Sequence, residues 1–107
     1  MTEYSEQDLY EPAMLAMAAR PEGRISTTDL IAELESSMKP TGHDAQLLRN
    51  RDDTHFSQLV RNIKSHKEVP GNAICDGLIE DSGRNEMRLT DLGFDYLRAK
   101  GHEVERL

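Results

Sequence analysis

Apolar positions recur along the chain with the spacing of short helices, interrupted once by a pattern typical of a β-hairpin. The first helix is expected from Glu11 to Ala19, where apolar side chains occupy nearly the whole circumference. Pro12 fits its first position, at which a missing N–H costs nothing, and Pro21 and Gly23 end it. A helix of this composition is expected to be the central element of the fold.

The strongest helix-start signal in the sequence lies at Ser26. Ser26 and Asp29 have the spacing of a capping box, and Ile25 and Leu30 are placed to form a hydrophobic staple. A second helix is therefore expected to begin here, with Pro40 beyond its end. Its apolar stripe comprises Leu30, Ile31, Leu34 and Met38.

A third helix is expected over about residues 53–66, after a short helical turn over residues 44–50. Asp53 or Thr54 can cap it. Apolar side chains at i, i+3, i+4 and i+7 give it an inward stripe, formed by Phe56, Leu59, Val60 and Ile63. The opposite face is polar and positive, and it holds Thr54, Gln58, Arg61 and Ser65, flanked by Ser57, Asn62 and Lys64.

A hairpin is expected near the C-terminal third of the chain, where two short runs over 78–81 and 86–89 flank a polar loop over 82–85. Thr90 then caps a last helix, and Gly101 lies just beyond its end. The residues of this helix that are expected to face inward are Leu92, Tyr96 and Leu97.

This order of elements predicts a mainly α fold with a small β-hairpin, arranged as a winged helix-turn-helix: a three-helix core, a two-stranded wing and a C-terminal helix. The length of 107 residues suits a single domain. We expect the domain to span residues 11–101, between a flexible acidic leader over 1–10 and a frayed tail over 102–107.

The composition favours a cytoplasmic protein. Cys75 is the single cysteine, and we expect it to be a small buried core residue in a short turn that begins at Asn72. No apolar run approaches the roughly 18 residues of a membrane span. Residues 1–11 are polar and acidic rather than signal-like, so no membrane association is expected.

The formal net charge is −7, but it is unevenly distributed. Residues 1–44 hold nine acidic and three basic residues, and residues 68–107 hold nine acidic and five basic residues. Residues 45–67 hold five basic and two acidic residues, and no acid falls between Thr54 and Lys67. The basic segment thus coincides with the third helix, whereas the acidic remainder argues against a simple nucleic-acid coat protein.

The segment over residues 56–66 (FSQLVRNIKSH) resembles the recognition helix of winged-helix domains in restriction-type proteins. Residues 77–80 (GLIE) and 88–97 (RLTDLGFDYL) are similar to the wing and closing helix of the N-terminal domain of Mrr-type restriction endonucleases. The resemblance covers roughly residues 11–101 and is firmest over 54–97. It implies a non-catalytic DNA-binding module that acts as a regulator or as an accessory part of a restriction, defence or phage-related system.

Side chains on such a helix can read base edges in the major groove. Gln58 and Asn62 suit adenine and Arg61 suits guanine, while Ser57 or Ser65 can bind phosphate. An arginine on the wing can enter a narrow minor groove. The cations expected to contact DNA in these ways are Lys64, Lys67, Arg49, Arg51, Arg84 and Arg88. The alternative is an ordinary solvated helix face beside a polar hairpin.

Other chemistry has little support in the sequence. The histidines and Cys75 lack the short spacing of a zinc site, and Asp52 and Asp53 before His55 are better explained as a helix cap than as an acid–base pair. We expect no enzyme activity, no metal and no cofactor. The expected partner is double-stranded DNA, bound by a monomer or a homodimer. Alternatively, the acidic surface of the domain binds another protein.

Overall fold

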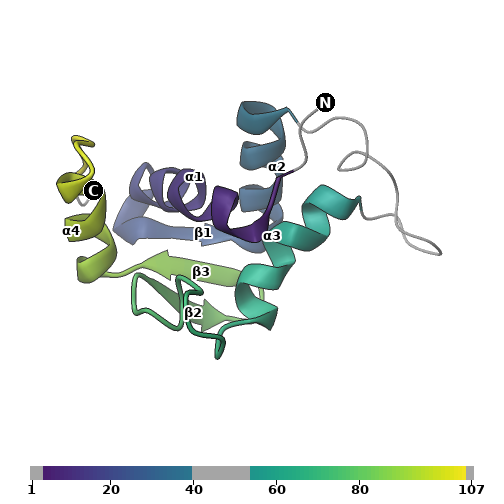
Figure 1. The fold of residues 1–107 in the computed structure, drawn as a ribbon. Helices are drawn as coiled ribbons and strands as arrows, with labels where there is room; N and C mark the ends of the chain where they lie inside the picture. Colours follow the sequence, from purple (N-terminus) through teal and green to yellow (C-terminus); the bar gives the residue numbers. More distant parts are fainter. Residues whose placement is uncertain (1–3, 40–53, 106–107) are drawn as a thin grey trace.

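The computed structural model describes residues 4–39 and 54–105, which form four α-helices, one 3-10 turn and three strands (Figure 1). The helices are α1 (Glu6–Ala18), α2 (Thr27–Met38), α3 (His55–Ser65) and α4 (Asp91–Ala99). The strands are β1 (Arg24–Ser26), β2 (Ile79–Gly83) and β3 (Glu86–Leu89), and the 3-10 turn η1 covers Pro21–Gly23. A mostly helical domain with a small β-sheet is therefore confirmed, while the turn predicted over 44–50 lies outside the described residues.

α1 begins at Glu6 rather than at the predicted Glu11. The backbone N–H of Ser5 donates to Asp8 Oδ2 at 2.8 Å and closes the first turn, as in a capping box. The prediction of a flexible leader over residues 1–10 is therefore wrong from Glu6 onward, because this local cap starts the helix earlier.

Pro12 lies inside α1 instead of at its start. An interior proline costs a helix about 3 kcal/mol, because it lacks one hydrogen-bond donor and crowds the preceding turn. Leu9, Ala13 and Met17 follow one another at helical spacing and are fully buried. Burial of a single leucine contributes about 1.5–3 kcal/mol, so the turn that precedes Pro12 offsets its cost by packing Leu9 into the core.

α2 begins as the sequence predicts. The N–H of Asp29 donates to Ser26 Oγ at 3.0 Å, and the two staple residues Ile25 and Leu30 are both buried. The inward stripe is confirmed for Leu30, Ile31 and Leu34, which are buried, and for Met38, which is half-buried against the core.

The sheet has three antiparallel strands in the order β1-β3-β2. The β2–β3 hairpin is confirmed, but β1 is missing from the prediction because three residues are too few to show an alternating pattern. Ile25 pairs with Met87 and Ile79 pairs with Leu89, and all four are buried. These pairs form the inner face of the sheet.

The hairpin turn is tighter than expected. β2 extends through Gly83, so the loop predicted over 82–85 is reduced to Arg84 and Asn85. The register shifts between Asp81 and Gly83, as in a β-bulge, which accommodates one extra residue in β2.

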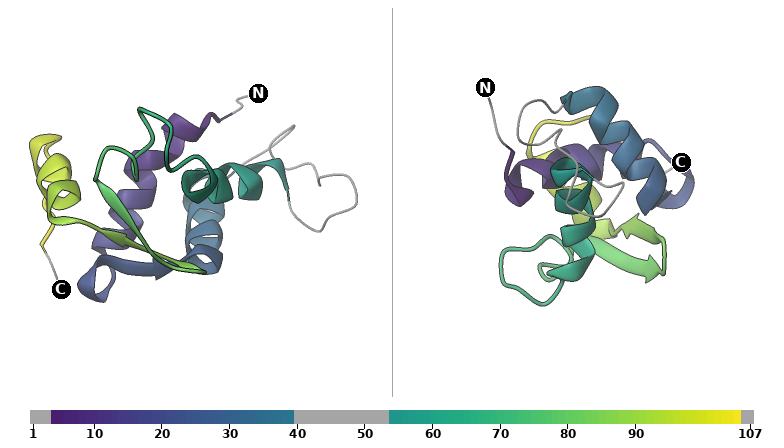
Figure 2. Two further views of the ribbon diagram at one scale, coloured as in Figure 1. Left: turned by 90° about the horizontal axis from the view of Figure 1, so that it is seen from below. Right: turned by 90° about the vertical axis from the view of Figure 1, so that its right-hand side faces the viewer.

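α1 lies at the centre of the fold. It contacts α2, α3 and α4 as well as β1 and β3. α4 and α3 lie at opposite ends of the molecule in Figures 1 and 2.

α4 is capped by Thr90, whose Oγ1 accepts a hydrogen bond from the N–H of Gly93 at 3.0 Å, as predicted. Leu97 is buried as predicted, and Tyr96 is half-buried. Leu92, in contrast, is 55% exposed, so its predicted inward position is wrong. Phe94 takes that position instead, because Gly93 allows α4 to approach β3 closely.

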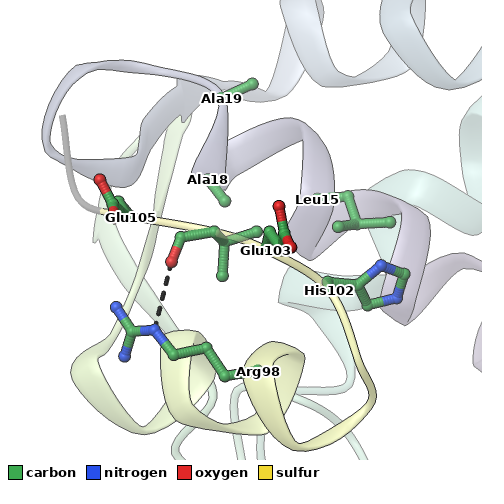
Figure 3. Close-up of a pocket in the computed structure, with 8 residues that line it drawn as sticks. Leu15, Ala18, Ala19, Arg98, His102, Glu103 and Glu105 are labelled. Atoms are coloured by element: carbon green, nitrogen blue, oxygen red, sulfur yellow. Dashed lines mark hydrogen bonds between the residues drawn. The ribbon is translucent and has the colours of Figure 1, made fainter.

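Residues 102–105, which were predicted to be a frayed tail, form no helix or strand and return along α1. Arg98 Nε donates to the carbonyl of Val104 at 3.2 Å, and Val104 packs half-buried against the core. Gly101 lies just after α4, as predicted, and adopts a φ of +94°. The returning segment borders an open groove of about 810 Å³ (Figure 3). The groove is lined by Leu15, Ala18, Ala19, Arg98, His102, Glu103, Val104 and Glu105.

We expect Gly93→Ala to destabilise the protein by about 3 kcal/mol or more, the upper range for an overpacked core. A Cβ at this position would lie 2.3 Å from the carbonyl oxygen of Leu78 and 2.4 Å from Leu89 Cδ1. Gly83→Ala is the matched control, because its Cβ would meet nothing closer than Glu86 Cβ at 3.8 Å. Urea unfolding measures both variants, and equal stabilities would contradict the close packing of α4.

Candidate nucleic-acid interface

α3 is fixed by its inner face. Phe56, Val60 and Ile63 are fully buried, and Leu59 is half-buried against the core, which largely confirms the predicted inward stripe. Arg61 and Ser65 are exposed on the opposite side of the helix. The orientation predicted for the polar face of α3 is therefore correct.

Gln58 and Asn62 form a pair on this helix. Gln58 Nε2 donates to Asn62 Oδ1 at 3.0 Å, and both residues are half-buried. Their spacing of one helical turn allows this contact, which orients the two amide groups relative to each other.

Ser57 does not lie on the outer face, so its predicted role in phosphate binding is wrong. It is buried, and its Oγ accepts from the N–H of Thr54 at 2.9 Å and donates to the carbonyl of Thr54 at 2.9 Å. The N–H of Ser57 donates in turn to Thr54 Oγ1 at 3.0 Å. Ser57 thus completes the capping box of α3, and Thr54 is confirmed as its cap.

Lys64 joins α3 to the hairpin. Its ammonium donates to the carbonyl of Gly83 and, at 3.2 Å, to the carbonyl of Arg84. The last turn of α3 therefore lies beside the hairpin turn (Figure 1). Only 16% of the Lys64 side chain is exposed, so this lysine is a link within the protein more than a free surface cation.

Asp81 of β2 bridges two lysines. Its Oδ1 lies 3.0 Å from Lys64 Nζ, and its Oδ2 lies 3.2 Å from Lys67 Nζ. The hydrogen bond from Lys64, reinforced by the one from Lys67, holds the pKa of Asp81 below its ordinary value, against the opposing effect of partial burial. Both predicted phosphate-binding lysines are thus already paired with a carboxylate.

The two predicted wing arginines differ. Arg84 is exposed in the hairpin turn. Arg88 lies across from Glu80 in the β2–β3 ladder, and its Nε donates to Glu80 Oε2 at 2.6 Å. This hydrogen bond raises the pKa of Arg88, so its guanidinium stays charged but paired. Arg84 is the better placed of the two for an external ligand.

Asn72 is a buried polar anchor that no pattern in the sequence indicates. Asn72 is 2% exposed, and its Nδ2 donates to the carbonyl of Ile63 at 3.0 Å and to Glu6 Oε2 at 3.3 Å. Its Oδ1 accepts from the N–H groups of Ile74 and Cys75. An Asn after a Pro-Gly pair predicts a turn, but no local pattern reveals partners this far apart in sequence.

A polar cluster around Glu6 ties the start of α1 to the end of α3. His66 Nδ1 lies 2.7 Å from Glu6 Oε1, and the Tyr10 hydroxyl donates to Glu6 Oε2. Burial, together with this hydrogen bond and the charge of Glu6, raises the pKa of Tyr10. The cluster holds the C-terminal end of α3 against the start of α1.

The turn after Asn72 also corrects the prediction for Cys75. Cys75 is exposed, whereas Ala73 is buried at 1% exposure. The turn thus places Ala73 in the core, while Asn72 Oδ1 accepts from the N–H groups of Ile74 and Cys75.

Arg49 and Arg51 lie outside the described residues. Within residues 4–39 and 54–105, no group of three or more metal-ligating side chains is found. No helix in this part of the chain is long and apolar enough to span a membrane. The groove of Figure 3 lies at the α4 end, away from α3.

Comparison of the chain with protein-family models, curated proteins and solved structures finds no match.

We expect Asn72→Ala to lower the free energy of unfolding by about 2 kcal/mol, because it leaves buried backbone groups without partners. Asn85→Ala is the control. Asn85 is exposed, and its side chain makes a single 3.3 Å hydrogen bond to Thr28 Oγ1. Urea denaturation compares the two, and a loss in Asn72→Ala no larger than in the control would show that Asn72 is not an anchor.

Asp81→Asn should lower stability at pH 7 by about 0.5–1 kcal/mol, the range for a partly exposed ion pair. Because the folded-state pKa of Asp81 is depressed, its contribution is present above the unfolded pKa of about 3.9 and is lost as pH falls through the folded value. The difference between wild type and variant should therefore shrink below about pH 4. Urea unfolding across this range measures it, and a pH-independent difference would contradict the ionic origin.

Proposed function

We propose that this protein is a non-catalytic, winged-helix DNA-binding module. In this proposal α3 enters the major groove, and the β2–β3 hairpin is the wing. The order of helix, strand, two helices, hairpin and closing helix supports it, as does the strand order β1-β3-β2. The resemblance of residues 54–97 to the N-terminal domain of Mrr-type restriction endonucleases supports it from the sequence.

The observation that carries the proposal is the contact of Lys64 with the hairpin turn. Lys64 follows Arg61 by one helical turn and precedes Ser65, and its ammonium lies 3.2 Å from the carbonyl of Arg84. The exposed residues Arg61 and Ser65 are therefore on a helix that is fastened to the segment carrying Arg84. A helix and a wing held in register can engage the base edges and the adjacent backbone of one duplex together.

The proposed contacts divide between base reading and backbone binding. Arg61 would bind guanine, and the oriented amides of Gln58 and Asn62 would contact adenine edges. Arg84 would contact backbone phosphate or enter the minor groove. With Lys64, Lys67 and Arg88 already paired, few phosphate contacts would contribute to affinity, so the salt slope of the wild type would be shallow.

The same pairing favours a second candidate function. A surface whose cations are neutralised within the protein suits a protein partner better than it suits a polyanion. In this alternative, the winged helix binds another protein through its acidic surface. Binding of a protein partner that survives substitutions on α3 would identify this function.

DNA binding is tested by titrating the protein with a mixed-sequence duplex at about 50 mM salt, where phosphate contacts are strong. We expect Arg61→Ala and Arg84→Ala each to weaken binding. Arg84→Ala, which removes a phosphate contact, should also lower the salt slope by about one. Lys100→Ala removes an exposed cation from the distant end of α4 and should leave binding unchanged.

Fluorescence anisotropy gives the affinities, and amide shifts in NMR spectra report the face that is used. Absence of wild-type binding at about 50 mM salt would refute the proposal. Equal losses of affinity in Arg61→Ala, Arg84→Ala and Lys100→Ala would show that the binding is nonspecific attraction of DNA to any cation.

A further inference from the structure

The pairing of β2 with β3 fixes the position of Asp81. Asp81 lies two residues after the buried Ile79 and opposite the buried Met87, so it belongs to the inward-directed side of β2. At the end of the hairpin this side meets the last turn of α3. A carboxylate is thereby held where the proposed DNA-binding face has its lysines.

Each oxygen of this carboxylate holds a different lysine. Oδ1 lies 3.0 Å from Lys64 Nζ and Oδ2 lies 3.2 Å from Lys67 Nζ, and only 26% of the Asp81 side chain is exposed. A backbone phosphate also offers two charged, non-bridging oxygens as hydrogen-bond acceptors. Asp81 therefore occupies the place that a phosphate would take between the two ammonium groups.

The two lysines would respond differently to the loss of Asp81. Lys64 would keep its hydrogen bonds to the carbonyls of Gly83 and Arg84, and its charge would stay beside the hairpin turn. Lys67 is 49% exposed and pairs with Asp81 at 3.2 Å, so the loss of Asp81 would release it toward solvent. The charge of Lys64 would then be uncompensated at a fixed place, and the charge of Lys67 could reach an external anion.

We propose that Asp81 is an internal competitor for DNA phosphate at Lys64 and Lys67, and that it limits the affinity of the proposed DNA-binding face for DNA. This inference rests on the proposed DNA binding. A phosphate that approaches Lys67 must displace the carboxylate and is repelled by it at close range. The wild-type face is therefore partly inhibited by its own wing.

The test is the salt dependence of duplex binding by Asp81→Asn, measured by anisotropy beside the wild type. Each added phosphate contact should steepen the plot of log affinity against log salt concentration by about 0.9. One such contact therefore tightens binding about eightfold when the salt concentration falls from about 1 M to about 0.1 M. We expect Asp81→Asn to bind the duplex on the order of eightfold more tightly than the wild type at about 0.1 M salt, and to have a steeper salt slope than the wild type.

Asp95→Asn is the matched control. It makes the same chemical change and releases Arg98 from a 3.0 Å ion pair, but on α4 at the far end of the molecule. It should leave affinity and slope unchanged. Lys67→Gln provides a second readout. It should lower DNA affinity little in the wild type, but it should abolish most of the affinity gained in the Asp81→Asn background.

The outcomes separate the two proposals. If the wild type binds and Asp81→Asn binds no more tightly, or gains no more than Asp95→Asn, the competitor role is refuted while DNA binding stands. The competitor role is also refuted if the effects of Lys67→Gln and Asp81→Asn on duplex affinity are additive. If neither the wild type nor Asp81→Asn binds at about 50 mM salt, both proposals fail. Binding by Asp81→Asn but not by the wild type would refute DNA binding by the wild-type protein, and the competitor role with it.

Discussion

Six apolar residues of α1 are buried, and the helix contacts α2, α3, α4 and two strands. Gln7 and Asp8 in its first turn are exposed, whereas its apolar side must be surrounded by the remaining elements. α3 packs on it through Phe56, Val60 and Ile63, which leaves a single direction for its polar residues. The outward position of Arg61 is therefore a consequence of the composition of α1 as much as of α3.

The sequence predicted elements wherever the signal was local. The caps at Ser26, Thr54 and Thr90 depend on residues three positions apart, and all three are present. The proline rule failed at Pro12, because the burial of Leu9 offsets the missing donor. β1 was missed because its three residues acquire their strand conformation from pairing with β3, which lies far away in sequence.

The candidate site was predictable in orientation but not in electrostatics. Periodicity identifies which residues of α3 point outward, because it depends only on helical geometry. It does not reveal that Lys64 and Lys67 meet Asp81, since that contact requires the register of β2 and the packing of α3 to be known together. Ser57 shows the same limit, because its hydroxyl serves the backbone at Thr54 in place of an external ligand.

β2 is an outer strand of the sheet, and outer strands are the places where separate protein molecules join edge to edge and aggregate. In this protein the strand is only five residues long, is interrupted by a bulge after Asp81, and carries adjacent negative charges at Glu80 and Asp81. Short length, a bulge and charge each disfavour the addition of a foreign strand. The hairpin can thus project at one end of the fold without acting as a template for self-association.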